Sequence, residues 1–343
     1  MRRRTTEVNE MIDTHQIRLS DIARPVDREL KEFRKFFRDS LRTDNLLLDT
    51  AIRYILKKKG KQVRPILVLL AAEAAGKLSR RSYIGGAMVE LLHTATLVHD
   101  DVVDEADERR GSPSVNSVWN NKTAVLVGDY MLAQGLRLAN ENGEFGFLDI
   151  TSKTVQRMSQ GELMQTRKTR KLDIQENEYF RIISDKTASL LAACCEIGAL
   201  SATDDPAIRK GLHRYGEMVG IAFQIRDDIF DFTSNGHDIG KPIGNDIQEK
   251  KLTLPLIHAL NTSTRRDAKR VIRLIRNGAN GHGIAETSLK VREFVGEHEG
   301  INYAEKIAHH YRDLARESLA ILPDSPATQA LHTFAEFVIA REK

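Results

Sequence analysis

The stretch AIRKGLHRYGEMVGIAFQIRDDIFDF, from Ala207 to Phe232, is too long for a β-strand, and its apolar residues recur at helical spacing. Asp205 and Pro206 come directly before this stretch. An aspartate N-cap followed by proline in the first turn is a favourable helix start. No proline occurs between Ser114 and Asp205, where the apolar residues have the same spacing. Because no alternating strand pattern with hairpin turns is visible, we expect an all-α fold.

The composition predicts one large helical bundle. The chain has 343 residues, of which 41% are hydrophobic and 29% charged, enough apolar material for a large core. No linker rich in proline, glycine or serine divides it. We therefore expect a flexible tail over 1–23 and a single domain over 24–343. Helices are expected at 27–40, 44–58, 63–76, 79–104, 121–140, 145–170, 176–201, 206–232, 252–261, 264–277, 284–297, 301–320 and 325–341.

Charge and cysteine content restrict the class further. The net charge of +4 does not by itself indicate a nucleic-acid partner. The adjacent Cys194 and Cys195 lie in an apolar run, which is typical of small core residues in a reducing compartment. No segment approaches the roughly 20 apolar residues of a membrane-spanning helix, and no apolar signal segment follows MRRRTTEVNE. We expect a cytoplasmic protein.

Two acidic motifs of identical spacing lie at the ends of apolar helices. The motifs are HDDVVD, with Asp100, Asp101 and Asp104, and RDDIFD, with Asp227, Asp228 and Asp231. On a helix, carboxylates four residues apart lie on one face and repel each other. One such motif alone is most simply a solvated helix end, but two copies indicate a common cause. Unpaired carboxylates among apolar residues are costly unless cations lie against them, and carboxylate sets suit magnesium that also contacts substrate phosphates.

Basic residues elsewhere could neutralise the remaining phosphate charge. They are Lys61 and Arg64 in GKQVRP, with Gly60; Arg109 and Arg110 in ERRGSP; Lys186 in SDKTASLL; and Lys241 and Lys251 in IGKPIGNDIQEKK. Arginine binds phosphate through two parallel hydrogen bonds, whereas lysine acts as a point charge. His93 falls on nearly the same helix face as Asp100, so this histidine is either a core residue or a diphosphate donor. A nucleic-acid interpretation of KKKGKQVR fails, since it has no interleaved aromatic residues and the acidic motifs would repel a phosphate backbone.

Seven segments in this order resemble the trans-isoprenyl diphosphate synthases over roughly residues 27–341. The segments are GKQVRP, ELLHTATLVHDDVVDEADERRGSP, VLVGDY, QGELMQ, DKTASL, GIAFQIRDDIFDF and GKPIGNDIQEKKLTLPLI. The resemblance implies an all-α homodimer of the isoprenoid synthase fold, with a deep central cavity. It implies a prenyltransferase that condenses isopentenyl diphosphate with an allylic diphosphate, farnesyl or geranylgeranyl, in trans 1'–4 fashion. It also implies three Mg²⁺ ions when diphosphate is bound.

The resemblance further implies roles for single residues. The six aspartates would bind magnesium directly or through water, most directly Asp100, Asp104 and Asp227. The allylic diphosphate would be held by Arg109, Lys186 and Lys241. Isopentenyl diphosphate would be held by Gly60, Lys61, Arg64, His93 and Arg110. The reacting centre would be lined by Thr187, Gln224 and Lys251. One departure is Lys250, which stands where the family usually has glycine and could alter closing of that loop.

The residues before the first motif bear on product length. Ala95 and Thr96 precede Asp100 by about one helical turn, and in the family bulky aromatic residues there mark enzymes that stop at short products. Both are small here, with Leu92 and Val89 below them. The glycines of IGGA (84–87) would either leave room for a tail or admit another helix closely, about 22 Å from the motif at 1.5 Å per residue.

These features favour a long-chain synthase of the heptaprenyl or octaprenyl type, whose products form side chains of respiratory quinones, with transient membrane contact for product release. The alternatives are a short-chain farnesyl or geranylgeranyl diphosphate synthase with a shallower pocket, or a non-catalytic regulatory subunit, which would usually have degraded aspartate motifs. A terpene cyclase fits less well, because such enzymes replace the second motif and need no isopentenyl diphosphate site.

Overall fold

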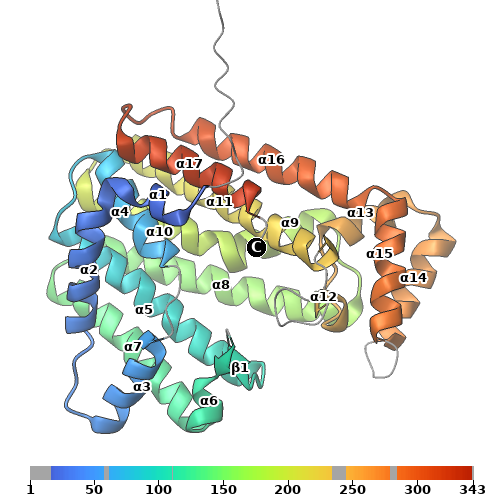
Figure 1. The fold of residues 1–343 in the computed structure, drawn as a ribbon, viewed down its shortest axis with the longest axis horizontal. Coiled ribbons are helices and arrows are strands. Elements are labelled where there is room, and N and C mark those ends of the chain that lie inside the picture. The colour runs from blue at the N-terminus through green and yellow to red at the C-terminus, as the bar shows by residue number, and fades with distance from the viewer. Residues whose placement is uncertain (1–16, 58–61, 110, 234–244, 279–283, 342–343) are drawn as a thin grey trace, which may run out of the picture.

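The computed structural model describes residues 17–57, 62–109, 111–233, 245–278 and 284–341, and over these ranges the chain is almost entirely helical (Figure 1). The elements of the first half are α1 (Leu19–Ile22), η2 (Arg24–Val26), α2 (Asp27–Asp39), α3 (Leu46–Lys57), α4 (Val63–Ala75), α5 (Arg80–Val103), β1 (Glu108–Arg109), β2 (Ser112–Pro113), α6 (Val115–Val118), α7 (Asn121–Glu141) and α8 (Phe145–Lys171).

The second half continues the bundle. Its elements are α9 (Glu176–Ile183), η3 (Ser184–Ala188), α10 (Ser189–Ala202), α11 (Pro206–Thr233), α12 (Asn245–Gln248), α13 (Leu254–Thr262), α14 (Arg265–Gly278), α15 (Ile284–Glu297), α16 (Gly300–Ser318) and α17 (Pro326–Ala340). The all-α prediction is confirmed, and each long helix begins and ends within a few residues of its expected bounds.

Helix α10 lies at the centre of the bundle. It packs against α4, α5, α8 and α11, and most of its residues are buried. Cys194 and Cys195 are fully buried in it, as expected of small core residues. Burial raises the pKa of the Cys194 thiol to about 12, so this group stays protonated. Helices α16 and α17 cover α11 along one face, and α14 and α15 stand at one end of the molecule (Figure 1).

The hydrophobic core has two main parts. The larger joins residues of α2, α4, α5, α10 and α17. The second surrounds the C-terminal half of α11 with residues of α9, α13, α15 and α16. Asp227, Asp228 and Asp231 belong to that half of α11, so the second acidic motif is built on the smaller core. No helix within the described ranges combines the length and the apolar character needed to span a membrane.

Three local features differ from the expectation. The helix expected at 176–201 is interrupted by a π-helical turn, η3, between α9 and α10. The loop after the first acidic motif contains a two-residue antiparallel ladder, Glu108 to Pro113 and Arg109 to Ser112, which turns at Gly111 with φ of 70°. Within the expected tail, Leu19–Ile22 form a short helix, and Ile22 is 1% exposed in the core.

Candidate active site

The two acidic motifs terminate two long helices of the bundle. Asp100 and Asp101 lie in the last turn of α5, and Asp104 is its C-cap residue. Asp227 and Asp228 lie near the C-terminal end of α11. Both helices bury their preceding apolar residues against α10, and this packing fixes where the carboxylates stand. The π-turn η3 packs against α11 and α8 beside them.

The first motif divides into an open and a paired carboxylate. Asp101 is 3% exposed, and its Oδ1 accepts a hydrogen bond from Nε of Arg109 on β1 at 2.5 Å. Asp100 reaches solvent. Desolvation by the surrounding protein raises its pKa, the carboxylate of Glu162 adds to the rise, and Lys186 opposes it. Asp100 therefore lies within the electrostatic reach of both Glu162 and Lys186.

The second motif is tied to the π-turn through Asp228. This carboxylate is 5% exposed and accepts hydrogen bonds from the hydroxyl of Tyr179 at 2.7 Å and from Nε2 of Gln224 at 2.8 Å. The Oε1 atom of Gln224 in turn accepts from the hydroxyl of Thr187 at 2.9 Å. Burial raises the pKa of Asp228 well above its ordinary value, and the carboxylate of Asp246 raises it further. The expected neighbours Thr187 and Gln224 are thus together.

The other two aspartates of this motif contact other elements. Oδ1 of Asp227 lies 2.5 Å from Nη2 of Arg341, which follows α17. Oδ2 of Asp231 accepts a hydrogen bond from the backbone N–H of Asp246 on α12 at 3.3 Å. The end of α11 is therefore fastened to α9, α12 and the end of α17 at three neighbouring carboxylates.

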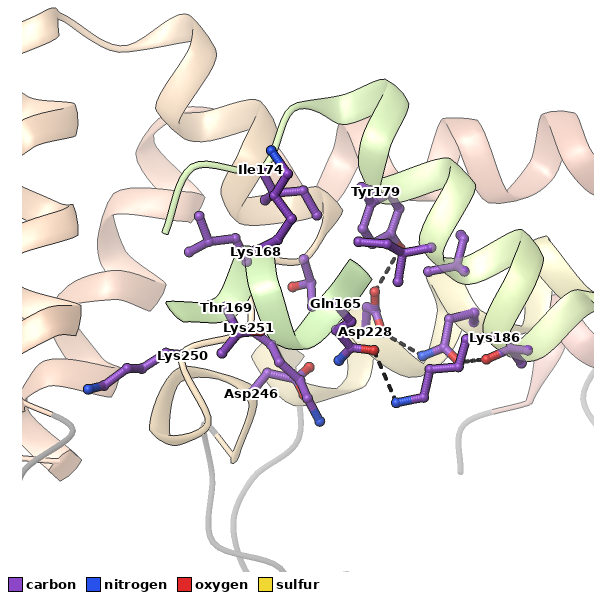
Figure 2. Close-up of a pocket in the computed structure, with 16 residues that line it drawn as sticks. Gln165, Lys168, Thr169, Ile174, Tyr179, Lys186, Asp228, Asp246, Lys250 and Lys251 are labelled. Carbon is purple, nitrogen blue, oxygen red and sulfur yellow. Dashed lines mark hydrogen bonds between the residues drawn. The ribbon is translucent and has the colours of Figure 1, made fainter. Parts of the chain in front are cut away.

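A cavity of about 190 Å³ opens beside Asp228 and Lys186 (Figure 2). Helices α8, α9, α11 and α12, the turn η3 and residues 250–253 contribute to its wall. Its lining residues are Gln165, Lys168, Thr169, Ile174, Tyr179, Ile182, Ile183, Lys186, Thr187, Gln224, Asp228, Asp246, Lys250, Lys251, Leu252 and Thr253. Four of the expected catalytic residues, Lys186, Thr187, Gln224 and Lys251, thus share one cavity with an aspartate of the second motif.

Lys186 and Lys251, two of the lysines that line the cavity, are each paired with a carboxylate. Nζ of Lys186 lies 2.6 Å from Oε2 of Glu162 and donates to Oε1 of Gln165 at 3.0 Å. Lys251 forms an ion pair with Glu249. Burial lowers the pKa of Lys251, but Glu249 and Asp246 outweigh this and leave it raised. The Lys251 ammonium is therefore charged near neutral pH.

The remaining expected cations are less fully described. Arg64 and His93 are half-buried on α4 and α5. Gly60, Lys61, Arg110 and Lys241 lie outside the described residues.

Lys250 adopts a left-handed conformation with φ of 59°. Glycine is the residue that takes this conformation without strain, so the backbone gives a physical reason for the glycine that the resemblance implies at this position.

The residues below the first motif are packed. Val89, Leu92 and Ala95 are buried, and the hydroxyl of Thr96 donates to the carbonyl of His93 at 2.9 Å. Of the two alternatives expected for the IGGA glycines, room for a tail or close approach of another helix, Gly85 follows the second. A Cβ atom there would lie 2.4 Å from Cγ2 of Ile197 and 3.4 Å from the ring of Phe147. Gly85 instead lets α10 and α8 approach α5 closely.

Several site residues were not anticipated from the sequence. Glu162 and Gln165 belong to the quoted segment QGELMQ, so their position in a recognised segment was a usable signal. Asp246 likewise belongs to the quoted segment GKPIGNDIQEKKLTLPLI. Tyr179 and Arg341 reach the carboxylates from distant elements, and a single sequence carries no local pattern that identifies them.

The carboxylates suit a hard divalent cation. Oxygen ligands are those that magnesium takes in proteins, and the raised pKa values of Asp100 and Asp228 reflect first their desolvation by burial and then the neighbouring carboxylates of Glu162 and Asp246. Within the described residues, no three side chains of histidine, cysteine, aspartate or glutamate already surround a common point. A cation bound here would complete its coordination with water and phosphate oxygens.

Comparison with known proteins identifies the family of this chain. The Polyprenyl synthetase family matches residues 45–290. Octaprenyl diphosphate synthase of Escherichia coli K12 is 35% identical over 305 residues, covering 89% of this chain and 93% of that protein. A short chain isoprenyl diphosphate synthase of Methanothermobacter thermautotrophicus is 33% identical over 296 residues, covering 85% and 90%.

A solved structure extends the likeness to the fold. Polyprenyl synthase from Caulobacter crescentus, complexed with calcium and isoprenyl diphosphate, superposes with a TM-score of 0.86 at 30% identity over 95% of this chain and 98% of that one. Fold and site therefore define an all-α prenyltransferase. The chain belongs to the polyprenyl synthetase family, and it is a trans-prenyl diphosphate synthase.

Proposed function

We propose that this enzyme extends farnesyl or geranylgeranyl diphosphate with isopentenyl diphosphate to a long-chain polyprenyl diphosphate for quinone side chains. The observation that carries the proposal is the convergence of both acidic motifs on η3. The positive charge of Lys186 acts on the carboxyl group of Asp100. Gln224 is hydrogen-bonded both to Asp228 and to Thr187. One short turn thus joins two carboxylate sets to a cation and a hydroxyl.

Magnesium is the proposed cofactor, with three ions when diphosphate is bound. When bound, it supplies positive charge that stabilises the departing diphosphate. Asp100, Asp104 and Asp227 are the proposed direct ligands. Asp101 and Asp228 are almost fully buried and already accept hydrogen bonds, which supports binding through water for them. Asp231, also on α11, is proposed to bind magnesium directly or through water together with Asp227 and Asp228.

The chain's own residues bind and orient the two diphosphates. Arg109 and Lys186, with Lys241 outside the described residues, would hold the allylic diphosphate. The cationic side chains stabilise negative charge as the allylic C–O bond breaks. The double bond of isopentenyl diphosphate then attacks the allylic carbon, and the proton lost from the adduct passes to the released diphosphate. No side-chain nucleophile is required in this scheme.

The second substrate would bind on the α4 and α5 side. Arg64 and His93 are the described residues proposed for isopentenyl diphosphate, together with Gly60, Lys61 and Arg110 outside the described ranges. The charges of Arg64 and Glu90 both act on the Cys194 thiol, so α4, α5 and α10 meet near this arginine. Lys251, in the cavity with Thr187 and Gln224, would line the reacting centre.

The proposed product length rests on Ala95 and Thr96, which are small where a growing tail would pass. The E. coli octaprenyl relative supports a long product. The packed Gly85 and the short-chain Methanothermobacter relative support the alternative, a farnesyl or geranylgeranyl diphosphate synthase. Sizing the product distinguishes the two.

A homodimer of single-domain subunits is also proposed. Large apolar side chains on α7 and α8 are exposed, and they are Leu126 at 57%, Leu136 at 44%, Phe145 at 66% and Leu163 at 72%. Exposed apolar residues on two neighbouring helices are typical of a protein interface. We place the enzyme in the cytoplasm, supported by the two buried free cysteines, with transient membrane contact for release of the lipid product.

The test is a direct elongation assay. Purified protein is incubated with Mg²⁺, labelled isopentenyl diphosphate and either farnesyl or geranylgeranyl diphosphate, and the dephosphorylated products are sized. We expect a ladder that ends at a long chain. Asp100→Ala and Asp227→Ala should lower turnover by about 10²-fold or more, whereas Asp39→Ala, which removes an exposed ion pair with Arg42, should not. Absence of chain extension by the wild-type protein would contradict the proposal.

A further inference from the structure

The turn η3 is held between two helices that approach its backbone directly. A Cβ atom at Gly161 of α8 would lie 2.9 Å from the backbone nitrogen of Lys186. A Cβ atom at Gly220 of α11 would lie 2.5 Å from Cα of Ala188. Neither helix has room for a side chain there. The position of Lys186 therefore depends on how α8 and α11 are placed against the turn.

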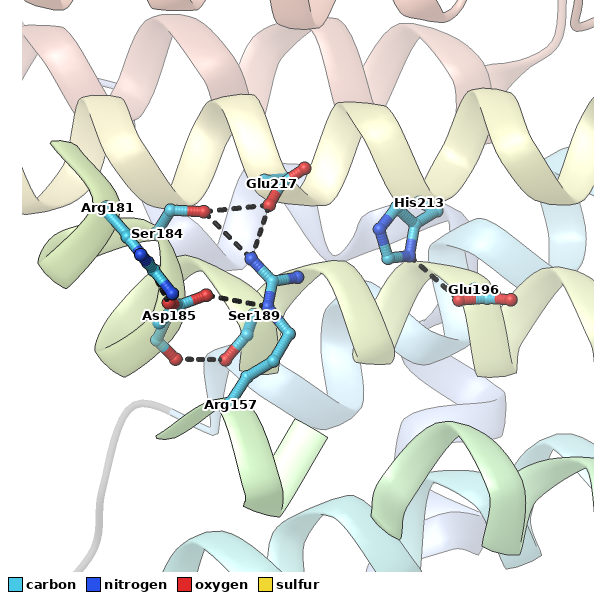
Figure 3. Close-up of polar contacts among 8 residues, drawn as sticks. All are labelled: Arg157, Arg181, Ser184, Asp185, Ser189, Glu196, His213 and Glu217. Atoms are coloured by element: carbon cyan, nitrogen blue, oxygen red, sulfur yellow. Dashed lines mark hydrogen bonds and ion pairs between the residues drawn. The ribbon is translucent and has the colours of Figure 1, made fainter. Parts of the chain in front are cut away.

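A polar network fastens both helices to the start of η3 (Figure 3). Arg157 of α8 donates from Nε to Oδ1 of Asp185 at 2.9 Å, and from Nη2 to Oε1 of Glu217 at 2.8 Å and to the hydroxyl oxygen of Ser184 at 2.9 Å. Ser184 donates to the same Oε1 of Glu217 at 2.9 Å. Ser189 donates to the carbonyl of Asp185 at 2.6 Å. One guanidinium thus joins α8, η3 and α11.

The network is charged and largely shielded from water. The side chains of Arg157, Asp185 and Glu217 are 33%, 16% and 22% exposed. Burial raises the pKa of Glu217, but hydrogen bonds from Arg157 and Ser184 outweigh it and leave the pKa below its ordinary value. Charge-assisted hydrogen bonds in such surroundings are stronger than neutral ones. Loss of one partner leaves the others partly buried with fewer charge-assisted hydrogen bonds.

Both helices contact the turn at two levels. On α11, Glu217 and Gln224 are seven residues apart and so lie on one face; the first binds Ser184 and the second binds Thr187. On α8, Arg157 and Gln165 are eight residues apart with Gly161 midway, and Gln165 accepts a hydrogen bond from Lys186. A rigid helix therefore connects the charged network to the contacts of Lys186 and Thr187.

We propose that Arg157 and Glu217 are positioning residues that fix Lys186 and Thr187, through Asp185 and Ser184, for the allylic diphosphate. The proposal rests on the proposed function, in which Lys186 holds that diphosphate. Neither positioning residue touches the substrate in this scheme. Their effect is on the geometry of the turn, and a misplacement of about 1 Å in a reacting group can lower a rate by about 10²-fold.

The chain offers a matched control in a second carboxylate network. Glu196 of α10 pairs with Nδ1 of His213 at 2.8 Å and with Arg209 at 3.5 Å on α11. Its side chain is 21% exposed, close to the value for Glu217. In Figure 3 this pair joins α10 to α11 beyond the turn, whereas the network joins α8, η3 and α11. Glu196→Gln therefore removes a comparable charge without altering the proposed positioning contacts.

The experiment compares Glu217→Gln with Glu196→Gln in the full-length enzyme. We expect Glu217→Gln to lower kcat/KM for the allylic diphosphate by about 10- to 100-fold, while KM for isopentenyl diphosphate changes by less than about twofold. Glu196→Gln should lower the melting temperature similarly and leave both kinetic constants near wild type. Arg157→Lys, which keeps the charge but not the three-partner geometry, should fall between wild type and Arg157→Met.

A double-mutant cycle tests whether the effect passes through Lys186. In a Lys186→Ala background, Glu217→Gln should cost only about twofold, because residues that act as a unit are not additive. Full additivity, or equal kinetic losses in Glu217→Gln and Glu196→Gln, would overturn the positioning role. If wild-type protein extends no allylic substrate, the proposed function itself fails. If Glu217→Gln does not fold, Arg157→Lys takes its place in the same cycle.

Discussion

The guanidinium of Arg341 lies 2.5 Å from Oδ1 of Asp227 and 3.8 Å from the centre of the Phe223 ring. Its side chain is 12% exposed, and desolvation lowers its pKa although Asp227 opposes this. A proposed magnesium ligand is therefore occupied by a cation of the chain itself. Magnesium and Arg341 would compete for the same carboxylate oxygen.

Arg341→Met is expected to tighten Mg²⁺ binding, because one competing cation is removed. The midpoint of a calorimetric Mg²⁺ titration in the presence of inorganic diphosphate should fall by about twofold to tenfold, a coupling of ordinary size. Arg42→Met, which breaks an exposed ion pair with Asp39, is the control and should leave the midpoint in place. An unchanged midpoint in Arg341→Met would show that the ion pair does not compete with metal.

Lys250→Gly is expected to stabilise the protein. The left-handed φ of 59° costs a residue with a Cβ atom about 1–2 kcal/mol, although the greater freedom of glycine in the unfolded chain offsets part of it. The free energy of unfolding in urea should rise by about 1 kcal/mol. Lys153→Gly, in the middle of α8, should instead lose about 1 kcal/mol. A loss at both positions would contradict the explanation from backbone strain.

Thr96→Phe is expected to shorten the product. Thr96 lies one turn from Asp100 on α5, and a phenyl ring there would fill the space proposed for the growing tail. Thr94 is also half-buried on α5. It is two residues from Thr96, and residues at that spacing do not share a helix face. Thr94→Phe therefore serves as the control when products are sized by chromatography. Equal product lengths for Thr96→Phe and wild type would remove Thr96 from the tail path.

The ends of α5 and α11 were predictable because each helix has a long apolar pattern that stops at a charged motif. The order of the motifs also predicted which residues would gather near Lys186. The π-turn was not predictable, since Ser184–Ala188 contain no proline or glycine that would mark an interruption of the helix. A π-helical turn contains one residue more than an α-helical turn. In this protein it is recognised only from the structure, where α8 and α11 pack against its two sides.

Contacts between segments far apart in the sequence could not be predicted either. Tyr179 and Asp228 are 49 residues apart, Arg157 and Glu217 are 60 apart, and Arg341 and Asp227 are 114 apart. Apart from Asp227 and Asp228, which belong to the second acidic motif, each of these side chains has an ordinary surface or core interpretation in its local sequence. Their roles follow from helix packing, which no local pattern determines.

The proposed dimer predicts a monomer on charge substitution. Leu136 of α7 is 44% exposed and lines a shallow surface pocket together with Leu148 of α8. Leu136→Glu would place a charge in a desolvated interface and should shift sedimentation velocity from dimer to monomer. Leu289→Glu, at a side chain 57% exposed on α15, should not change the oligomeric state. A Leu136→Glu protein that sediments like wild type would place the interface elsewhere.

Glu196 should contribute an acid-sensitive part of the stability. Burial raises its pKa, but the hydrogen bond and charge of His213 outweigh this and leave the folded pKa below the ordinary value of 4.5. A carboxylate with a lowered folded pKa binds fewer protons in the native state, so its stabilisation is present above 4.5 and is lost as pH falls through the folded pKa. The difference in free energy of unfolding between wild type and Glu196→Gln should therefore be largest near neutral pH and shrink below 4.5. Denaturant unfolding across this range measures it, and a difference that grows on acidification would show that the ion pair with His213 is not its source.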